Sequence, residues 1–344
     1  MKFLQFIKGL NITSHIEIVT PAPPGSLHGN RITALRWQGF LKKLGHEARI
    51  YTKWSGKSTD ILIALHAYRS HASIVHFRKV HPNRPIILIM TGTDLYRDMP
   101  SHPEVLKSME MSDAIVILQS AALAMIPKHL QAKTHTIYQS TKPVKRKALL
   151  KKSFLISVIG HLRPEKDPFC TAESLKYLGP ESKIKVLHLG KAMSSEMKSL
   201  AKAYNKELKN YQWLDELSHS ETLQQLSRSH LMVISSLMEG GAHVVTEAIA
   251  IGVPVIASDI PGNRGLLGDD YPGYYPVRDA KALALILQKA EFEPSFYKSL
   301  EAHIKKRVRY AQPSAEKRSI KLLMESLLKR VNNCLLYTSD AADE

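Results

Sequence analysis

The feature that most limits how this chain can fold is a repeated alternation of short apolar runs with amphipathic helical patterns. The run IEIVTP, for example, is followed by a polar loop and then by RITALRWQGFLKKLG, whose apolar residues have helical spacing. Nearly continuous apolar runs are typical of parallel strands that are covered on both faces. Alternating strands and helices therefore predict an α/β fold built on doubly wound sheets. The expected strands lie in IEIVTP, HEARIYT, DILIALH, PIILIM, DAIVILQS, FLISVIG, KIKVLHLG, YQWLDEL, HLMVISS and VPVIASD.

A basic stretch, KPVKRKALLKK at residues 142–152, interrupts this alternation, which then restarts. We predict an N-terminal α/β domain over residues 15–145, a solvated linker over 146–152 and a second α/β domain over 153–305. A basic surface for a membrane or nucleic acid is the alternative for the linker. A helical segment at 306–331 has the pattern to pack on either domain. Residues 1–14 are expected to be an extension, and residues 332–344 a non-native or disordered tail.

Composition narrows the functional classes. The formal net charge of +17 indicates binding of anions, which leaves nucleic acid, a membrane surface and phosphorylated small molecules open. Cys170 and Cys334 have no ligand spacing, which argues against a disulfide framework or a zinc site and fits a reducing cytoplasm. No run reaches the roughly 18 apolar residues of a membrane helix, so stable membrane insertion is not expected. The chain has no DxD pair and no GxGxxG pattern, so neither a carboxylate-held metal nor a dinucleotide cofactor is predicted.

Ligands of doubly wound sheets bind beyond the carboxyl ends of the strands, and the turn after HLMVISS is the most informative one. It reads EGGAHVVTE, with Glu239 and Glu247 at its ends. If a helix begins near Ala242, the N–H groups of Gly240, Gly241 and Ala242 suit a phosphate. Glu239 is then placed to accept sugar hydroxyls. Glu247 lies in an apolar helix and needs donors, which are ribose hydroxyls or, alternatively, His243 or a lysine.

Three more turns are candidate sites. In IGHLRPEKDP, the stretch from Gly160 and His161 to Arg163 and Lys166 offers cations for a diphosphate, although a solvated basic loop fits equally well. In the first domain, the loop PPGSLHGNR and the turn TGTDLYRD are the candidates for binding a second anion or sugar, with an ordinary connection or helix capping as their alternatives. Their predicted binding residues are Gly29, Asn30, Arg31, Thr91, Gly92, Thr93, Asp94 and Arg97. His66 ends DILIALH on the same side, where a lone histidine is as often structural as catalytic.

Taken together, IGHLRPEKDP and EGGAHVVTEAIAIGVPVIASD resemble the nucleotide-sugar glycosyltransferases of the GT-B fold, which have two facing Rossmann-like domains. Glu239 and Glu247 match the E-x7-E motif of that family. The segments HGNRITALRW, TGTDLYRD and IPGNRGLLGDDYPGYYPV are further similar to the selenosugar synthases of selenoneine biosynthesis. The resemblance implies transfer from UDP-N-acetylglucosamine or UDP-glucose to selenophosphate, without a metal or another cofactor.

The resemblance also implies roles for individual residues. Glu247 would bind the ribose and Glu239 the sugar, Lys166 and the amides of residues 240–242 the diphosphate, and Gly190 would line the nucleotide pocket. Glu239, His66 and Asp94 are the predicted catalytic residues. His161 stands where many relatives have arginine, with Arg163 as the candidate to supply that charge, and EGGAH replaces the common EGFGL.

Two other functions remain as alternatives. One is a glycosyltransferase with a hydroxyl acceptor, and the other is a basic nucleic-acid-binding protein without catalysis. The second would need basic residues interleaved with aromatic ones, and an aromatic content of 7% is unremarkable. No nucleic-acid partner is therefore predicted, and the oligomeric state is left open.

Overall fold

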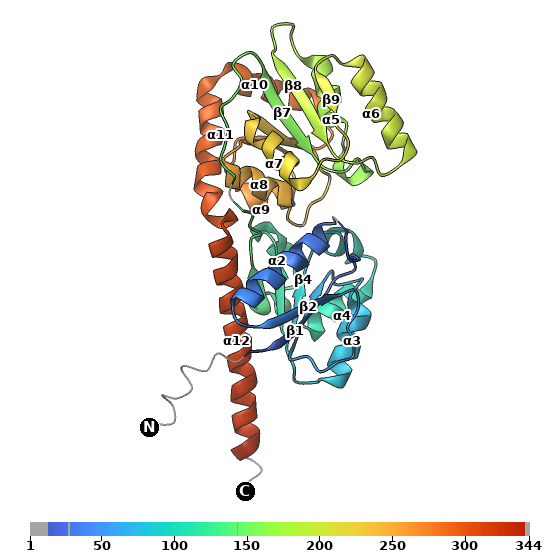
Figure 1. Ribbon diagram of the computed structural model, residues 1–344, viewed down its shortest axis with the longest axis vertical. Coiled ribbons are helices and arrows are strands. Elements are labelled where there is room, and N and C mark those ends of the chain that lie inside the picture. The colour runs from blue at the N-terminus through green and yellow to red at the C-terminus, as the bar shows by residue number, and fades with distance from the viewer. Residues whose placement is uncertain (1–12, 27, 143, 341–344) are drawn as a thin grey trace. The chain divides into compact units, whose positions relative to one another are not determined.

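The computed structural model describes residues 13–26, 28–142 and 144–340, and most of the expected extension 1–14 lies outside them (Figure 1). The chain forms two compact units. The first unit contains the described residues up to Leu118, together with Leu123–Ile137 and the chain from Lys317. The second unit contains Gln119–Ala122 and Tyr138–Glu316.

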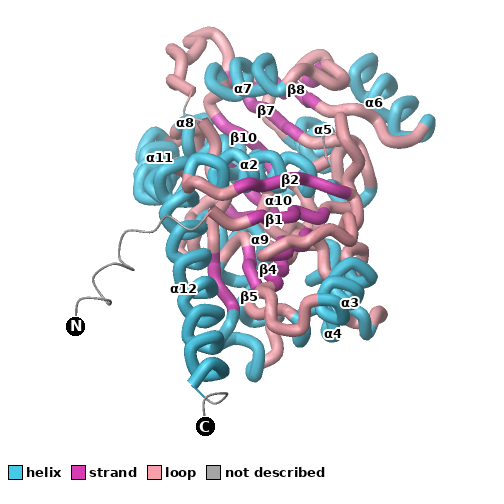
Figure 2. The backbone as a smooth tube through the Cα atoms, turned by 60° about the horizontal axis from the view of Figure 1, so that its bottom comes forward, coloured by secondary structure: helices cyan, strands magenta, loops and turns pink. Residues whose placement is uncertain are grey.

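The first unit is built on a six-stranded parallel sheet with the order β2-β1-β3-β4-β5-β6. Figure 2 shows β1 and β2 running side by side, in register from the pair His15 and Glu47 to the pair Val19 and Tyr51. The strands are β1 (His15–Val19), β2 (Glu47–Tyr51), β3 (Ile61–Leu65), β4 (Ile86–Ile89), β5 (Ala114–Ile117) and β6 (Thr134–Thr136).

The second unit has a six-stranded parallel sheet with the order β12-β11-β10-β7-β8-β9. Numbered from one within the unit, this order reads 6-5-4-1-2-3, which is that of a doubly wound Rossmann sheet. The strands are β7 (Phe154–Ile159), β8 (Ile184–Leu189), β9 (Tyr211–Trp213), β10 (Leu231–Ile234), β11 (Val255–Ser258) and β12 (Tyr274–Tyr275).

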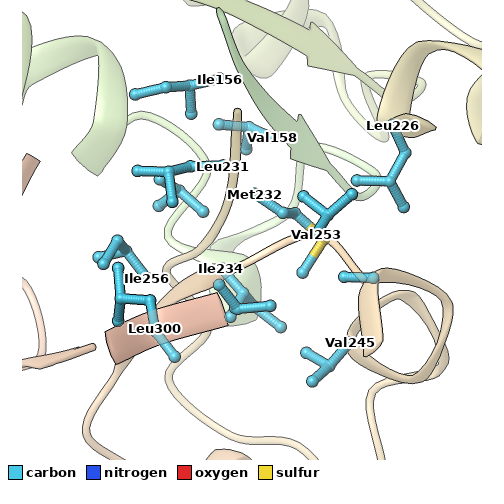
Figure 3. Close-up of a cluster of buried hydrophobic side chains, with 14 of the residues drawn as sticks. Ile156, Val158, Leu226, Leu231, Met232, Ile234, Val245, Val253, Ile256 and Leu300 are labelled. Atoms are coloured by element: carbon cyan, nitrogen blue, oxygen red, sulfur yellow. The ribbon is translucent and has the colours of Figure 1, made fainter. Parts of the chain in front are cut away.

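The apolar runs explain why these segments become strands. Every residue of β3, β4, β5, β10 and β11 is buried, as expected of strands that helices cover on both faces. Figure 3 shows part of the resulting core of the second unit, where side chains of β7 and β10 meet Val245 and Leu300 from two helices. The predicted α/β fold is confirmed. The sequence missed β6 and β12 because these edge strands of three and two residues carry no apolar run.

Helices connect the strands of both units. Several begin at side chains that cap them, such as Ser218, which forms a capping box with Glu221 at the start of α7. The helices of the first unit are α2 (Gly29–Lys43), α3 (His71–Val80) and α4 (Pro103–Met111), with a π-helical turn η2 (Asp94–Asp98). Those of the second unit are α5 (Cys170–Ser174), α6 (Ser195–Glu207), α7 (His219–Arg228), α8 (His243–Ile251), α9 (Pro261–Leu267), α10 (Ala280–Phe292) and α11 (Pro294–Arg307).

The last helix, α12 (Pro313–Asp340), begins in the second unit and continues into the first. The buried apolar side chains that the structure describes in this helix belong to the core of the first unit, on which the sequence left the packing open. These are Ile320, Leu323, Met324 and Leu327. The helix continues to Asp340, within residues 332–344, which the sequence predicted to be a non-native or disordered tail. The segment contains neither proline nor glycine to end the helix earlier.

The basic stretch 142–152 is less solvated than predicted, because Arg146 anchors it to the second unit. The Arg146 guanidinium donates hydrogen bonds to the Gly252 carbonyl and, at 2.9 Å, to the Tyr297 hydroxyl. It also lies 3.2 Å from the carboxylate of Glu301. A solvated face was expected from the run of lysines, and it is this arginine among them that is half-buried.

Within the described part of the chain, no helix combines the length and the apolar character that crossing a membrane requires.

Candidate active site

The order of the second sheet places a topological switch point between β7 and β10, which are neighbours although they are not consecutive. The chain leaves the sheet in opposite directions from these two strands, which opens a crevice at their carboxyl ends. A small cavity lies there. Its lining includes Gly160, Lys166, His188, Ser235 and Ser236, which come directly after or near the ends of β7, β8 and β10.

Lys166 and Glu239 form an ion pair at this edge of the sheet. The turns that carry them are joined, because the Ser235 hydroxyl donates to the carbonyl oxygens of Lys166 and Asp167 at 2.9 and 2.8 Å. The Glu239 side chain is 10% exposed and that of Lys166 is 22% exposed. The structure therefore brings together the predicted diphosphate cation and the predicted sugar-binding carboxylate.

A glycine of the next turn allows the chain to pass close to Glu239. A Cβ atom on Gly262 would lie 2.1 Å from the Glu239 carbonyl oxygen, so only glycine fits there. The neighbouring Asn263 is fully buried and donates from Nδ2 to the Ser258 carbonyl at 2.9 Å. In the sequence, IPGN contributes to the family resemblance but gives no signal that Gly262 has this role.

Helix α8 begins at His243, with Ala242 as its N-cap residue, which confirms the predicted start near Ala242. No side chain caps it. The amide of Gln139 donates to the Gly241 carbonyl at 2.6 Å and fixes the backbone of the glycine turn. The N–H groups of Gly240 and Gly241 make no hydrogen bond to any residue that the structure describes. This helix start is therefore suited to bind an anion.

Glu247 lies in the second turn of α8 and is 4% exposed. Its Oε1 lies 3.1 Å from Nδ1 of His243 and 2.6 Å from Nε2 of His219. Burial raises the pKa of Glu247, but its hydrogen bonds to the two imidazoles outweigh burial and lower the pKa to about 2. The hydrogen bond to Glu247 in turn raises the pKa of His219. Glu247 is thus a buried anion at neutral pH.

The sequence offered His243 as the local partner of Glu247, at helical spacing, and this pair is present. It did not offer His219, the first residue of α7, since nothing in the spacing links that helix to α8. The capping box that fixes the start of α7 at Ser218 was the available signal for where His219 would stand.

The remaining predicted residues of this unit surround the turn after β7. His161 accepts a hydrogen bond at Nδ1 from the Lys191 N–H at 3.3 Å. Arg163 is exposed at the start of the short 3-10 turn that contains Lys166. A Cβ on Gly190 would lie 1.9 Å from the Gly160 carbonyl oxygen, so Gly190 allows the ends of β7 and β8 to pack closely.

In the first unit, Asp94 organises the turn TGTD. Its Oδ1 accepts hydrogen bonds from the N–H groups of Thr91 at 2.9 Å and Gly92 at 2.8 Å, and its Oδ2 accepts one from Ala67 at 2.9 Å. Asp94 is fully buried. These bonds make it a structural residue of the turn, and its catalytic role stays a prediction.

His66 follows β3 with a φ of 74°, a left-handed conformation that is uncommon for a residue with a Cβ. Its Nε2 lies 3.0 Å from the Thr93 hydroxyl and 3.6 Å from Oδ2 of Asp98, and its Nδ1 accepts from the Arg69 N–H at 3.3 Å. Burial lowers the pKa of His66. The side chain is 1% exposed, so both ring nitrogens are engaged inside the unit.

The other predicted residues of the first unit lie at two places. Arg97 is half exposed and donates from Nε to Asp98 at 2.8 Å. Gly29, Asn30 and Arg31 form the first turn of α2, which begins two residues earlier than the sequence indicated. His28 is the extended N-cap residue, so the helix takes up the last residues of the expected loop.

Residues 140–308, about half of the chain, match the family model of the glycosyl transferases group 1. This segment is thus similar to the glycosyl transferases group 1. It contains all the second-unit residues discussed above except Gln139, and it ends near the last residues of α11. The matched segment contains the Lys166–Glu239 pair, the glycine turn and Glu247 with both of its histidine partners.

Curated proteins similar to this chain include two glycosyltransferases. Glycosyltransferase 1 domain-containing protein 1 of Xenopus tropicalis is 25% identical over 71% of this chain and 79% of that protein. The UDP-Gal:alpha-D-GlcNAc-diphosphoundecaprenol alpha-1,3-galactosyltransferase of Escherichia coli is 29% identical, over 37% of this chain and 33% of that protein.

Solved structures show the same fold for nearly the whole chain. The HepE protein of Anabaena, solved in complex with UDP and glucose, superposes with a TM-score of 0.69 at 12% identity, covering 91% of this chain and all of that one. Sucrose-phosphate synthase of Thermosynechococcus elongatus superposes with a TM-score of 0.75 at 14% identity, covering 92% and 99%. The two parallel six-stranded units of this chain therefore have the GT-B fold of glycosyltransferases.

Among the described side chains of both units, no group of three or more histidine, cysteine, aspartate or glutamate residues is placed to hold a metal ion.

Proposed function

We propose that this protein transfers a sugar from a UDP-sugar, UDP-N-acetylglucosamine or UDP-glucose, to selenophosphate. The second unit binds the donor and the first unit binds the acceptor. The observation that carries the donor assignment is the arrangement along α8: a buried carboxylate at Glu247, a glycine turn with unused N–H groups, and the Lys166–Glu239 pair before it.

This arrangement matches the three parts of a nucleotide sugar. Glu247 is an anion held in a fixed position by His219 and His243, and it accepts hydrogen bonds from ribose hydroxyls. The N–H groups of Gly240 and Gly241 and the Lys166 ammonium bind the diphosphate. Glu239 accepts hydrogen bonds from the sugar. Two comparisons support this assignment: residues 140–308 match the family model of the glycosyl transferases group 1, and the structurally similar HepE was solved with UDP.

The burial and hydrogen bonding of His66 and Asp94 in the first unit support an acceptor that is already ionised. His66 and Asp94, its predicted catalytic residues, are buried and hydrogen-bonded within the unit. A hydroxyl acceptor must lose a proton as it reacts, whereas the selenium of selenophosphate carries its lone pairs and negative charge from the start. Arg31 and Arg97 supply positive charge for such an anion. The similarity of TGTDLYRD to the selenosugar synthases agrees with this assignment.

In the proposed reaction, selenium forms a bond to the anomeric carbon of the sugar while the bond from that carbon to the diphosphate breaks. The electron pair of the broken bond leaves with UDP. Water then cleaves the bond between selenium and phosphorus, which releases phosphate and leaves a selenosugar. Positioning and charge stabilisation are the contributions required of the protein.

The donor assignment is tested by UDP titration calorimetry with the wild type and with Glu247→Gln, which keeps the shape of the side chain and removes its charge. We expect UDP affinity to fall about 10- to 100-fold, because hydrogen bonds to a charged group contribute about 1.5 to 3 kcal/mol. Lys145→Ala, an exposed basic residue outside the site, is the control. Equal affinity of the wild type and Glu247→Gln would refute the assignment.

The acceptor assignment is tested by mass spectrometry after incubation of the wild type with each UDP-sugar and selenophosphate. A selenosugar together with UDP is the expected result. The E. coli relative, whose name describes a sugar hydroxyl acceptor, favours a hydroxyl acceptor as the second candidate. UDP binding without any selenosugar, combined with transfer to a hydroxyl acceptor, would decide for that candidate.

A further inference from the structure

A histidine that the proposed reaction does not use lies beside the donor crevice. His188 is on β8 and is 1% exposed. Its Nδ1 lies 2.8 Å from the hydroxyl of Tyr211, at the start of β9. Its ring lines the same small cavity as Gly160 and Lys166, where the Gly160 backbone acts on its pKa as a hydrogen-bond partner. His188 therefore connects the interior of the sheet to the turn that follows β7.

The hydrogen bonds determine which nitrogen of this imidazole carries the proton. The Gly160 N–H already donates to the Leu189 carbonyl at 2.9 Å, so the group of Gly160 that faces the ring is its carbonyl. A carbonyl only accepts, and Nδ1 is taken by Tyr211, so Nε2 carries a hydrogen. A neutral imidazole then has a lone pair on Nδ1, to which the Tyr211 hydroxyl donates.

The Gly160 carbonyl is confined from a second side. The backbone of Gly190 lies so close that a Cβ there would approach the carbonyl oxygen to 1.9 Å. Gly160 itself faces the stem of Lys166, since a Cβ on Gly160 would lie 4.0 Å from Cδ of that lysine. The peptide after Gly160 thus sits between the buried histidine and the cation that is paired with Glu239.

We propose that His188 is a positioning residue for the donor. With Tyr211 it forms a chain of two hydrogen bonds that ends on the Gly160 carbonyl and sets the turn over which Lys166 reaches the diphosphate. This inference rests on the donor assignment above and deepens it, because it adds a buried residue, outside the E-x7-E motif, on which donor affinity depends.

The electrostatic state of His188 agrees with this arrangement. Burial lowers the pKa of His188 to about 4, so the ring is neutral and keeps one donor and one acceptor over the whole neutral range. The ring centroids of Phe169 and Tyr211 lie 6.5 and 6.0 Å from that of His188, both in an edge-to-face arrangement.

The mildest test removes one hydroxyl. In Tyr211→Phe the ring stays in place, and the donor to Nδ1 is lost. We expect the Kd of UDP and the KM of the UDP-sugar to rise about three- to tenfold, the effect of a buried hydrogen bond left unmade, with kcat less affected. His188→Gln, whose amide can both donate and accept, should retain more affinity than His188→Leu.

Tyr204→Phe is the matched control. Tyr204 is an aromatic neighbour of Tyr211, and its hydroxyl donates to Glu173 at 2.6 Å rather than to His188. A merely structural role would make the Tyr211 and Tyr204 variants alike, with lower thermal midpoints and unchanged Kd. Nitrogen-15 NMR of the wild type adds an independent readout, since a proton on Nδ1 of His188 would overturn the proposal.

The outcomes separate this inference from the donor assignment. If the wild type binds UDP, Glu247→Gln does not, and Tyr211→Phe binds as the wild type does, the role of His188 is refuted and the donor assignment stands. If the wild type does not bind UDP, the donor assignment fails first.

Discussion

Nε2 of His219 lies 2.6 Å from Oε1 of Glu247, a contact that joins the first residue of α7 to the second turn of α8. The two residues differ sharply in exposure, since the His219 side chain is 65% exposed and the Glu247 side chain is 5% exposed. A solvent-accessible imidazole is therefore the outer partner of a buried carboxylate. The protonation of that imidazole should be visible in the behaviour of the whole domain.

We expect the His219 contact to stabilise the protein more at acidic than at alkaline pH. The pKa of His219 is raised in the folded state, so its contribution is complete below the ordinary histidine pKa of about 6.5 and fades as the pH rises through the raised value. Thermal midpoints of the wild type and His219→Gln should differ most near pH 5.5 and converge near pH 9. A constant difference across this range would contradict the prediction.

Glu247 gives the opposite dependence. Its pKa of about 2 lies below the ordinary value for glutamate, so its contribution is present above about pH 4.5 and is lost as the pH falls toward 2. The acid limb of the stability curve should therefore move to higher pH in Glu247→Gln, as measured by circular dichroism between pH 2 and 6. An unchanged acid limb would mean that the carboxylate is not held as an anion.

Substitution of Lys166 should affect the donor more than the fold. Lys166→Met leaves Glu239 without its partner and removes the cation from the crevice, so we expect KM for the UDP-sugar to rise and kcat to fall, together at least about tenfold in kcat/KM. Lys166→Arg keeps the charge and should recover part of the loss. If Lys166→Met retained wild-type kinetics, the cation would have no role in donor binding.

Gly262→Ala should damage the site through the backbone. The new Cβ would lie 2.1 Å from the Glu239 carbonyl, so one of the two segments must move, at a cost of about 1 to 3 kcal/mol. Gly39→Ala in α2 is the control, because a Cβ there meets no atom within 4 Å and alanine favours a helix. Urea unfolding together with UDP binding should show losses in Gly262→Ala alone.

Arg146→Met should destabilise the second unit by about 2 to 4 kcal/mol, because the Gly252 carbonyl and the Glu301 carboxylate lose a charged donor. The neighbouring Lys145 is exposed, and Lys145→Met should change the free energy of unfolding by less than about 0.5 kcal/mol. Equal effects of the two substitutions would show that the stretch is a solvated linker after all.

The sequence predicted much of the fold because burial on both faces of a parallel sheet leaves a continuous apolar run. Each predicted run became a strand, while β12, with only Tyr274 and Tyr275, left no such trace. The start of α8 could also be predicted, because the helical pattern begins directly after Gly240 and Gly241, at Ala242. The end of this helix at Gly252, whose φ is 82°, was predictable for the same kind of reason.

Contacts between elements were less accessible to sequence reasoning. Spacing along one helix identified His243 as a neighbour of Glu247, but His219 reaches the same oxygen from another helix. Asp98 lies beside His66 in space although the two belong to different turns. In the sequence, no local pattern distinguishes Arg146 from its lysine neighbours, and only the structure shows its hydrogen bond to the Gly252 carbonyl. Such pairs depend on how helices pack, which no local pattern encodes.

The division of α12 between the two units has a consequence for synthesis on the ribosome. Ile320, Leu323 and Met324 complete the core of the first unit, yet they are translated after the whole of the second unit. The sheet formed by strands β1 to β6 therefore exposes an apolar face until α12 has been synthesised and packs on it. We expect nascent chains that stop before Lys317 to depend on chaperones, even though every strand of both sheets has already been made.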